Sequence, residues 1–287
     1  MKLSKKMQNV KVMENNERLF SCPICSSEMM LEDQVRFVCT NGHSFDLAKS
    51  GYVNLAPQAH TTKYDKTLFE ARTAVMSSGF FEPIIHKLVE QVIQQIGHVD
   101  NPVILDAGCG EGTHLSMMHA QLPGEAVGIG IDLAKEGIVT ASKMYPGFIW
   151  SVADLAAMPF RDEQIDVILN VLSPANFAEF TRLLKPGGAV VKVVPESGYL
   201  KELREVFYEG KPQKEESDPV GRFAEHFDSV QSERVTYTFE LPEGLLSPLI
   251  HMTPLAWGAG VEKIEEALRM GIREITIDLR VIWGIRR

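Results

Sequence analysis

The chain has 287 residues, of which 45% are apolar and 23% charged, so it is long enough to bury a full core beside a small second unit. This excludes a disordered chain and a mini-protein. The 29 basic and 38 acidic residues give a net charge of −9, which argues against a uniformly basic protein that coats nucleic acid. Residues 1–75 nevertheless carry ten basic and eight acidic side chains, so affinity for a polyanion is expected in this +2 segment.

The N-terminus shows neither hydrophobic periodicity nor an apolar core of signal-peptide length. We therefore expect residues 1–19 to be a frayed lead-in and the protein to be cytoplasmic. The most apolar window, residues 245–261, is interrupted by Pro248 and Pro254 and is too short for a membrane span. No membrane partner is expected.

A cysteine cluster follows the lead-in. Cys22-Pro-Ile-Cys25 precedes Cys39-Thr-Asn-Gly-His43 by thirteen residues, and this spacing is typical of a tetrahedral zinc site. All four positions are filled by protein ligands, so the site is predicted to be structural and closed. The alternative is a pair of buried, reduced cysteines with an unrelated histidine. Residues 20–66 are predicted to be a zinc-binding unit that ends in a polar connector at residues 60–66.

From residue 67 onward, helical and strand patterns alternate. Apolar residues recur at helical spacing over residues 84–96, and residues 103–107 form a short buried strand. Further strands are predicted at residues 126–131, 148–152, 165–172 and 189–194, with helices between them at residues 135–145, 177–184 and 200–207. This alternation predicts a doubly wound parallel sheet. The β-branched segments 235–239 and 275–283, separated by a helical segment at 261–270, predict an antiparallel pair at its end.

A glycine-rich turn follows the first strand of this region. Asp106-Ala-Gly108-Cys-Gly110-Glu-Gly112 ends a strand with an acid and opens a helix, and its glycines allow the backbone to approach a ligand closely. The dinucleotide fingerprint requires a third glycine where Thr113 stands, so NAD fits poorly. The pattern is instead that of methyltransferases that use S-adenosylmethionine.

Two further acids follow the next two strands. Asp132 lies where a carboxylate accepts ribose hydroxyls in doubly wound folds. Asp154, followed by Leu155, lies where a carboxylate receives the adenine amino group. Either acid alone would fit a solvated or capping role equally well, whereas the loop and both acids together indicate a cofactor site. Lys-Pro-Gly-Gly at residues 185–188 is the turn typical of the same enzyme class.

The fourth strand ends in Asn170-Val-Leu-Ser173-Pro174-Ala, where such enzymes place their chemistry. An Asn-Pro-Pro-aromatic motif and a Pro-Cys nucleophile are both absent from the sequence here, and Cys109 lies in the glycine loop. Covalent catalysis is therefore disfavoured. Direct methyl transfer to a ring nitrogen, an oxygen or a small-molecule carbon stays open.

The whole chain resembles one family. The cysteine cluster, Gly51-Tyr-Val-Asn54-Leu and Met252-Thr-Pro-Leu-Ala-Trp257 are similar to the bacterial 23S ribosomal RNA guanine-N1 methyltransferases from about residue 20 to the C-terminus. The resemblance implies a Rossmann-like class I fold with a seven-stranded, mostly parallel sheet after an N-terminal zinc unit. It also implies a 23S rRNA hairpin as the target, a homodimer, and a link to tylosin resistance in one branch. No DNA partner is implied.

The resemblance implies zinc on Cys22, Cys25, Cys39 and His43, and S-adenosylmethionine contacts from Gly110, Glu111, Phe81 and Tyr199. For Phe81, simple packing is an equal alternative. With the residues noted above, the predicted cofactor site comprises Asp106, Gly108, Gly110, Glu111, Gly112, Asp132, Asp154, Leu155, Phe81, Asn170 and Tyr199.

An RNA target places further demands on the protein. Guanine N1 lies on the pairing edge, so the base must be unpaired or flipped out of its stack. Trp257 and Tyr52 are candidates for base stacking, against a buried structural role. Candidates to steer the RNA phosphates are Lys49, Lys63, Lys66 and Arg72, with ordinary solvated surface charge as the alternative for the same residues. The proton acceptor is left open between water and an unidentified carboxylate.

Two other functions fit parts of the pattern. A small-molecule methyltransferase with an appended zinc unit would act on metabolites without RNA. A non-catalytic RNA-binding factor would keep the fold without using the cofactor, although the intact loop with Asp132 and Asp154 argues against it.

Overall fold

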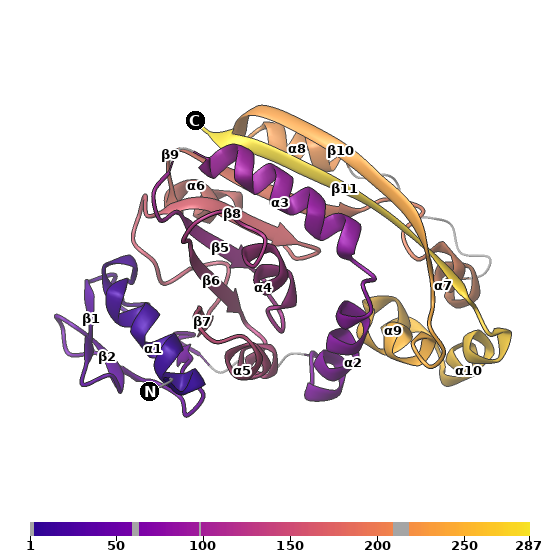
Figure 1. Ribbon diagram of the computed structural model, residues 1–287, viewed down its shortest axis with the longest axis horizontal. Coiled ribbons are helices and arrows are strands. Elements are labelled where there is room, and N and C mark those ends of the chain that lie inside the picture. The colour runs from indigo at the N-terminus through magenta and orange to yellow at the C-terminus, as the bar shows by residue number, and fades with distance from the viewer. Residues whose placement is uncertain (1–2, 59–62, 98, 209–217) are drawn as a thin grey trace.

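The structure is a computed structural model that describes residues 3–58, 63–97, 99–208 and 218–287. Its central sheet has eight strands in the order β10-β11-β9-β8-β5-β6-β7-β4 (Figure 1). In chain order these are β4 (Val53–Asn54), β5 (Val103–Ala107), β6 (Val127–Asp132), β7 (Ile149–Val152), β8 (Ile165–Val171), β9 (Leu184–Pro195), β10 (Phe227–Glu240) and β11 (Glu274–Arg286). The strands from β4 to β9 pair in parallel, whereas β11 runs antiparallel to both β9 and β10.

The doubly wound sheet and its antiparallel end are confirmed. The expected seven strands are β5 to β11, and the eighth, β4, comes from the N-terminal region. Every residue of β5 and β8 is buried, as expected for parallel strands that are covered on both faces. At the sheet edge, β10 alternates between more and less exposed residues. It begins at Phe227, eight residues before its predicted start.

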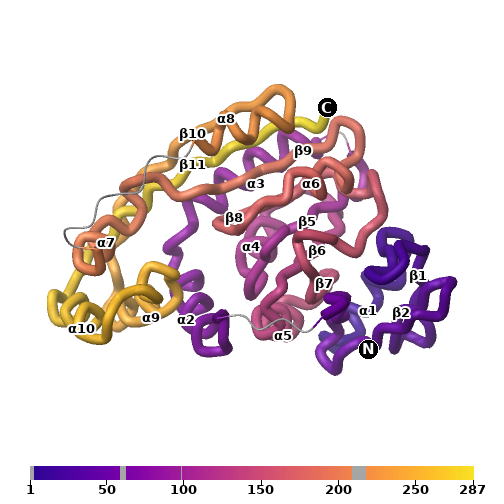
Figure 2. Tube along the Cα trace, turned by 180° about the vertical axis from the view of Figure 1, so that it is seen from behind, coloured from indigo at the N-terminus to yellow at the C-terminus, as the bar shows by residue number. Residues whose placement is uncertain are grey.

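Helices cover both faces of this sheet. On one face, α3 (Glu82–Ile96) packs on β8, β9 and β11, and α4 (Thr113–His119) packs on α3 and β6. On the other face lie α6 (Phe177–Leu183) against β9 and α8 (Pro219–Ala224) against β10 and β11 (Figure 2). After β5 the chain builds one side of the sheet with β6 and β7, then crosses to the other side with β8 and β9. Ligands of such folds bind at the carboxyl ends of the strands beside this crossover.

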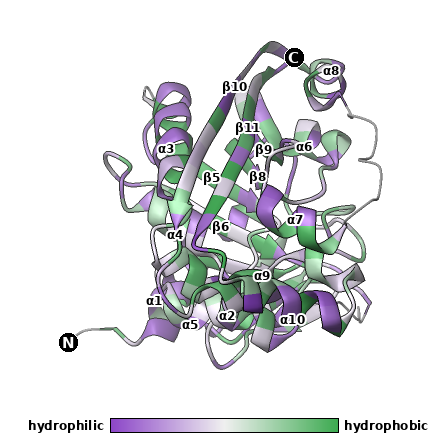
Figure 3. Cartoon of the chain, turned by 90° about the vertical axis from the view of Figure 1, so that its right-hand side faces the viewer, coloured by the Kyte–Doolittle hydropathy of each residue, from purple (hydrophilic) through white to green (hydrophobic). Residues whose placement is uncertain are grey.

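A helical insertion separates β10 from β11. It consists of α9 (Leu246–Met252), the 3-10 turn η2 (Pro254–Gly258) and α10 (Val261–Met270). The helix α2 (Lys66–Ser77) packs against α9, and α7 (Lys201–Phe207) packs against η2 and α10. Figure 3 views the molecule from this side, where α10 is mainly hydrophilic. The helices α2, α5 (Lys135–Met144) and α9 lie together at the carboxyl ends of the strands (Figure 1).

The predicted lead-in is a helix, α1 (Lys5–Asn15), so its expected frayed state is wrong. Ser4 caps the helix by accepting a hydrogen bond from the backbone of Met7, and Val10 and Met13 are fully buried. The helix presents only a narrow apolar stripe, and tertiary contacts with α5 and β7 stabilise it. This is why its periodicity is too weak to be recognised in the sequence.

The N-terminal unit is joined closely to the sheet. It contains η1 (Glu17–Leu19) and a three-stranded antiparallel sheet, β1 (Met29–Glu32), β2 (Arg36–Cys39) and β3 (Ser44–Asp46). Its last strand, β4, pairs in parallel with β7, and Phe20 contacts Phe160 with ring centroids 5.5 Å apart. Part of the predicted connector, residues 60–62, lies outside the described residues. Among the described helices, each falls short of the length and apolar character that a membrane crossing requires.

Candidate metal centre and cofactor site

Two turns of the N-terminal unit bring four metal-ligating side chains together. Cys22 and Cys25 lie in the first turn, and Cys39 and His43 lie in the second, where Gly42 adopts a φ of +81°. One ligand atom from each of the four residues lies within 4.8 Å of the other three. These are the four residues whose spacing predicts a zinc site.

The separations fit a tetrahedral zinc ion. Cys25 Sγ lies 3.7 Å from Cys39 Sγ, and His43 Nδ1 lies 3.5 Å from the sulfur of Cys22 and 3.4 Å from that of Cys39. Zinc–sulfur bonds of about 2.3 Å at tetrahedral angles place two sulfurs about 3.8 Å apart. The side-chain hydrogen bond of Cys25 with Ser27 is the largest cause that lowers the pKa of this thiol, to about 5, which favours the metal-binding thiolate.

The glycine loop links β5 to α4. Gly108, Gly110 and Gly112 all have positive φ, between 57° and 89°. A Cβ on Gly108 would lie 2.0 Å from Ser173 Oγ, and one on Gly112 would lie 2.5 Å from the Trp150 ring. The loop is therefore fixed both by backbone conformation and by close packing, and substitution of these two glycines would displace it.

Asp106, at the carboxyl half of β5, is a buried acid without a hydrogen-bond partner among the described residues. It is 1% exposed, and neither of its side-chain oxygens is hydrogen-bonded. Burial raises the pKa of Asp106 to about 7, although Arg72 opposes this. A buried carboxylate without a hydrogen-bond partner, next to the glycine loop, fits a cationic ligand group such as the ammonium of S-adenosylmethionine.

Arg72 on α2 reaches into the same loop. Its Nε lies 2.7 Å from Oε2 of the fully buried Glu111, an ion pair whose angles are not those of a hydrogen bond. Its Nη2 lies 3.3 Å from Nδ1 of His114. Burial disfavours the charged form of Arg72, but Glu111, Asp132 and Asp106 outweigh this, so its pKa is raised. Arg72 is therefore not an ordinary solvated surface charge, whereas its contact with a phosphate stays a prediction.

Sequence reasoning missed Arg72 as a member of this site. The residue lies 39 positions before Glu111, on a helix without a recognisable binding motif. Only the packing of α2 over the loop brings the two together, since a Cβ on Gly110 would lie 3.4 Å from both Arg72 and Phe69. The glycine spacing marks the loop but gives no signal for the segment that covers it.

Asp132 and Asp154 lie at the ends of β6 and β7, as predicted. Asp132 accepts hydrogen bonds from the backbones of Gly110 at 2.8 Å and Ala134 at 2.7 Å, so it closes the loop. Burial raises the pKa of Asp132. Asp154 accepts a bond from Ala156 at 2.9 Å. Each carboxylate keeps further acceptor capacity for a ligand. Leu155 packs beside Gly108.

The other predicted cofactor residues surround this loop. Phe81 is 2% exposed and packs edge-to-face on Phe80 and on His114. Tyr199 is partly buried. Burial raises the pKa of its hydroxyl, although the positive charge of Arg72 opposes this. Asn170 donates to the carbonyls of Ala107 at 2.8 Å and Pro174 at 3.0 Å, and accepts from Lys192. Its side chain thus braces the loop after β8, and cofactor contacts from these three residues stay predictions.

The two stacking candidates have opposite environments. Tyr52 is only 8% exposed and belongs to the core, which excludes it as a stacking surface for RNA. Trp257 is 41% exposed, so the alternative that it has a buried structural role is wrong. Lys49, Lys63 and Lys66 are exposed, and Lys66 forms a surface ion pair with Glu70.

Comparisons with known proteins define the class. The family model described as "RlmA, N-terminal", a zinc ribbon, matches residues 20–63, and one described as "Methyltransferase domain" matches residues 104–188. The two matches cover the metal cluster and the glycine loop with both later acids. The protein is a class I methyltransferase, and its cofactors are S-adenosylmethionine and a structural zinc ion.

Two relatives define the family. The YxjB protein of Bacillus subtilis, provisionally named a 23S rRNA (guanine-N(1)-)-methyltransferase, is 39% identical over 93% of this chain and 97% of its own. The 23S rRNA (guanine(748)-N(1))-methyltransferase of Streptomyces fradiae is 30% identical over 93% of this chain and 96% of its own. The chain belongs to the 23S rRNA (guanine-N1)-methyltransferase family, which confirms the resemblance.

Proposed function

We propose that this protein transfers a methyl group from S-adenosylmethionine to N1 of a guanine in a hairpin of 23S ribosomal RNA. The observation that carries the proposal is the similarity to the Streptomyces fradiae enzyme, which extends over 93% of the chain and includes the zinc ligands as well as the cofactor loop. A small-molecule methyltransferase with an unrelated zinc unit would share the cofactor loop but not the zinc ligands.

We propose the following roles for the cofactor site. S-adenosylmethionine supplies an electrophilic methyl group on a sulfonium. Asp106 would bind its ammonium group, Asp132 its ribose hydroxyls, and Asp154 with Leu155 its adenine. The backbone of the glycine loop would follow the cofactor closely, and Arg72 would hold Glu111 in place. Gly108, Gly110, Gly112, Phe81, Asn170 and Tyr199 complete the proposed site.

The proposed division of labour follows the two units. Residues 20–66 would recognise RNA and supply the connector, with zinc held by Cys22, Cys25, Cys39 and His43, whereas residues 67–287 would hold the cofactor and carry out methyl transfer. Residues 1–19 would support both, because α1 contacts α5 and β7 of the second unit and Asn9 donates a hydrogen bond to the carbonyl of Ser50 in the first. The zinc would act structurally, since four protein ligands leave no position for substrate.

We also propose a cytoplasmic homodimer in which the zinc units face a shared RNA. Three large apolar side chains of this unit, Ile24, Met30 and Val35, are each at least 50% exposed, which supports a partner surface there. Sedimentation of the purified protein at twice the monomer mass would agree with the proposal. A tylosin-resistance role would appear as sensitisation of cells that lack the protein.

The activity is tested by incubating the protein with methyl-labelled S-adenosylmethionine and unmodified 23S rRNA transcript. We expect label in the RNA. Label in small molecules alone would support the metabolite enzyme, and a lack of cofactor binding in calorimetry would support a non-catalytic RNA-binding factor.

A further inference from the structure

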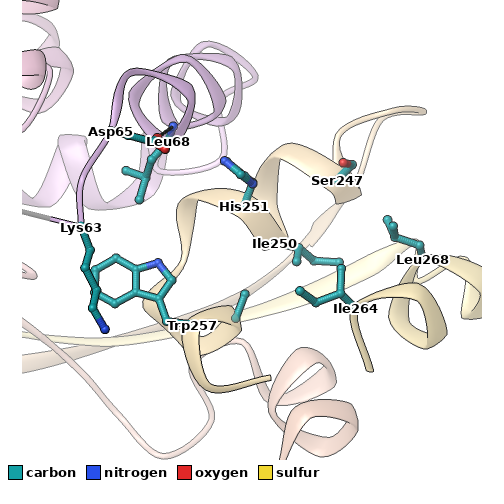
Figure 4. Close-up of a pocket in the computed structure, with 10 residues that line it drawn as sticks. Lys63, Asp65, Leu68, Ser247, Ile250, His251, Trp257, Ile264 and Leu268 are labelled. Atoms are coloured by element: carbon teal, nitrogen blue, oxygen red, sulfur yellow. Dashed lines mark hydrogen bonds between the residues drawn. The ribbon is translucent and has the colours of Figure 1, made fainter. Parts of the chain in front are cut away.

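A half-open pocket of about 250 Å³ lies between α2 and the helical insertion. Leu68, Ile250 and Ile264 form its apolar lining, and Asp65, His251 and Trp257 contribute polar and aromatic groups (Figure 4). Pockets for drug-sized ligands hold about 300–1,000 Å³. The volume therefore suits a single heterocyclic ring system, and we refer to it as the Trp257 pocket.

Trp257 is held in place although it is exposed. Its turn, η2, is fixed where Thr253 Oγ1 accepts a bond from the backbone of Leu255 at 3.3 Å and Tyr208 donates to the carbonyl of Leu255 at 3.1 Å. Trp150 is fully buried and Trp283 is 9% exposed, against 41% for Trp257. A fixed, exposed indole beside a cavity is a ready stacking surface.

A row of aromatic rings connects the Trp257 pocket to the cofactor loop. Trp257 contacts Tyr64 edge-on at 5.1 Å between centroids, and Tyr64 stacks with Phe69 at 6.2 Å. Phe69 in turn packs against Gly110 and Gly137. A ligand in the pocket is thus separated from the cofactor loop by these side chains, at the same edge of the sheet.

We propose that the Trp257 pocket takes up one unpaired nucleobase of the RNA substrate, stacked on the indole, with Lys63 facing its phosphate. The inference rests on the proposed function. A base offers the flat face that the ring and the apolar lining require, and a polar edge for Asp65 and His251. Lys63 Nζ lies over the indole, 5.8 Å from the ring centroid, so a base stacked on this face would take the place of the ammonium, which would then turn to the phosphate of the same nucleotide. Asp65 caps α2 by accepting a hydrogen bond from the backbone of Leu68 through Oδ1, which leaves Oδ2 for the base edge. A purely apolar metabolite would give Lys63, His251 and this oxygen no polar partner.

The first test is fluorescence of the full-length protein. Because Trp257 is the most exposed of the three tryptophans, an RNA hairpin with an unpaired loop should quench the emission, and a fully paired RNA of equal length should not. The variant Trp257→Phe should abolish the quenching. Equal quenching by both RNAs, or quenching that persists in the variant, would overturn the proposal.

The second test separates binding from catalysis. Trp257→Ala should raise the KM for RNA about 5- to 150-fold, as expected for loss of one base–aromatic stack, while kcat and cofactor affinity stay within about twofold. Trp257→Phe should restore most of the loss. Met270→Ala, which is 61% exposed on α10 outside the pocket, is the matched control.

The outcomes distinguish this inference from the proposed function. If the wild-type protein methylates the transcript and Trp257→Ala has an unchanged KM or loses only kcat, the base pocket is wrong and the activity stands. If the wild-type protein methylates no RNA, the proposed function itself fails and the pocket inference fails with it.

Discussion

At the scale of single residues, the cofactor site concentrates buried charge. Asp106 and Glu111 are at most 1% exposed, and Arg72 is the cation that approaches Glu111 at 2.7 Å. Burying charge is unfavourable unless partners offset it, so the desolvation of these acids lowers the stability of the cofactor-free protein. A cationic ligand would offset this loss. The site is therefore expected to be sensitive to both mutation and pH.

Arg72→Met should leave Glu111 as an uncompensated buried charge. We expect the free energy of unfolding to fall by about 3–5 kcal/mol, the range for breaking a buried ion pair, and cofactor affinity to fall at least about tenfold. Lys66→Met, on the same helix with a 75% exposed side chain, should change stability by less than about 0.5 kcal/mol. Denaturant unfolding and calorimetry measure both quantities, and equal effects of the two variants would contradict the role of Arg72.

Asp106 should make the stability of the cofactor-free protein depend on pH. Burial raises its folded pKa to about 7, so the folded state binds a proton that the unfolded state releases near pH 4. Its contribution is fully present below pH 4 and is lost as the pH rises towards 7, at up to about 1.4 kcal/mol per pH unit. Unfolding measured from pH 5 to 8 should show this decline in the wild type and a flatter profile in Asp106→Asn. Identical profiles would refute the assignment.

At the scale of elements, regular structure is predictable where local pattern and tertiary demand agree. The run Val103–Ala107 is apolar except for Asp106, and β5 has these bounds. By contrast, α1 and β4 could not be predicted, because a two-residue strand and a narrow helical stripe carry little local signal. The zinc ligands and the acids at the strand ends follow from spacing, whereas Arg72 depends on how α2 packs over the loop.

Asn9 shows how α1 attaches the N-terminal unit. Its amide donates to the carbonyls of Ser50 at 3.2 Å and Ser142 at 3.1 Å, and accepts from the backbone of Gly147 at 2.8 Å. Asn9→Ala should lower the free energy of unfolding by about 2–4 kcal/mol, because buried backbone groups lose their partners. Denaturant titration beside Lys11→Ala, which alters an exposed side chain of α1, checks this. A loss below about 1 kcal/mol would contradict it.

At the scale of the whole molecule, the two units share a core. Phe20 and Cys22 of the zinc unit belong to the same buried cluster as Phe160 and Ile149 of the sheet, and β4 extends that sheet. Charge is also unevenly distributed over the molecule: the net charge is −9, but the first quarter of the chain carries +2, so the net charge is a poor guide to RNA binding. Binding to non-cognate RNA is expected to be weak and salt-sensitive.

Cys25→Ser should remove the zinc and unfold the N-terminal unit, because metal ligation supplies most of the folding free energy of so small a unit. We expect metal analysis to find zinc in the wild type and none in the variant. RNA methylation should be lost, and thermal unfolding should begin at a lower temperature because of the shared core. Thr40→Ala, which alters an exposed side chain between the proposed ligands Cys39 and His43, serves as the control. A native protein without zinc would contradict the prediction.

The most direct test of the central claim is to map the methylated base. A methyl group on guanine N1 blocks Watson–Crick pairing, so reverse transcription of 23S rRNA treated with this protein and S-adenosylmethionine should stop beside one guanine of a hairpin. The stop should be absent when the cofactor is omitted. Read-through along the whole RNA, with label recovered only in small molecules, would contradict the account.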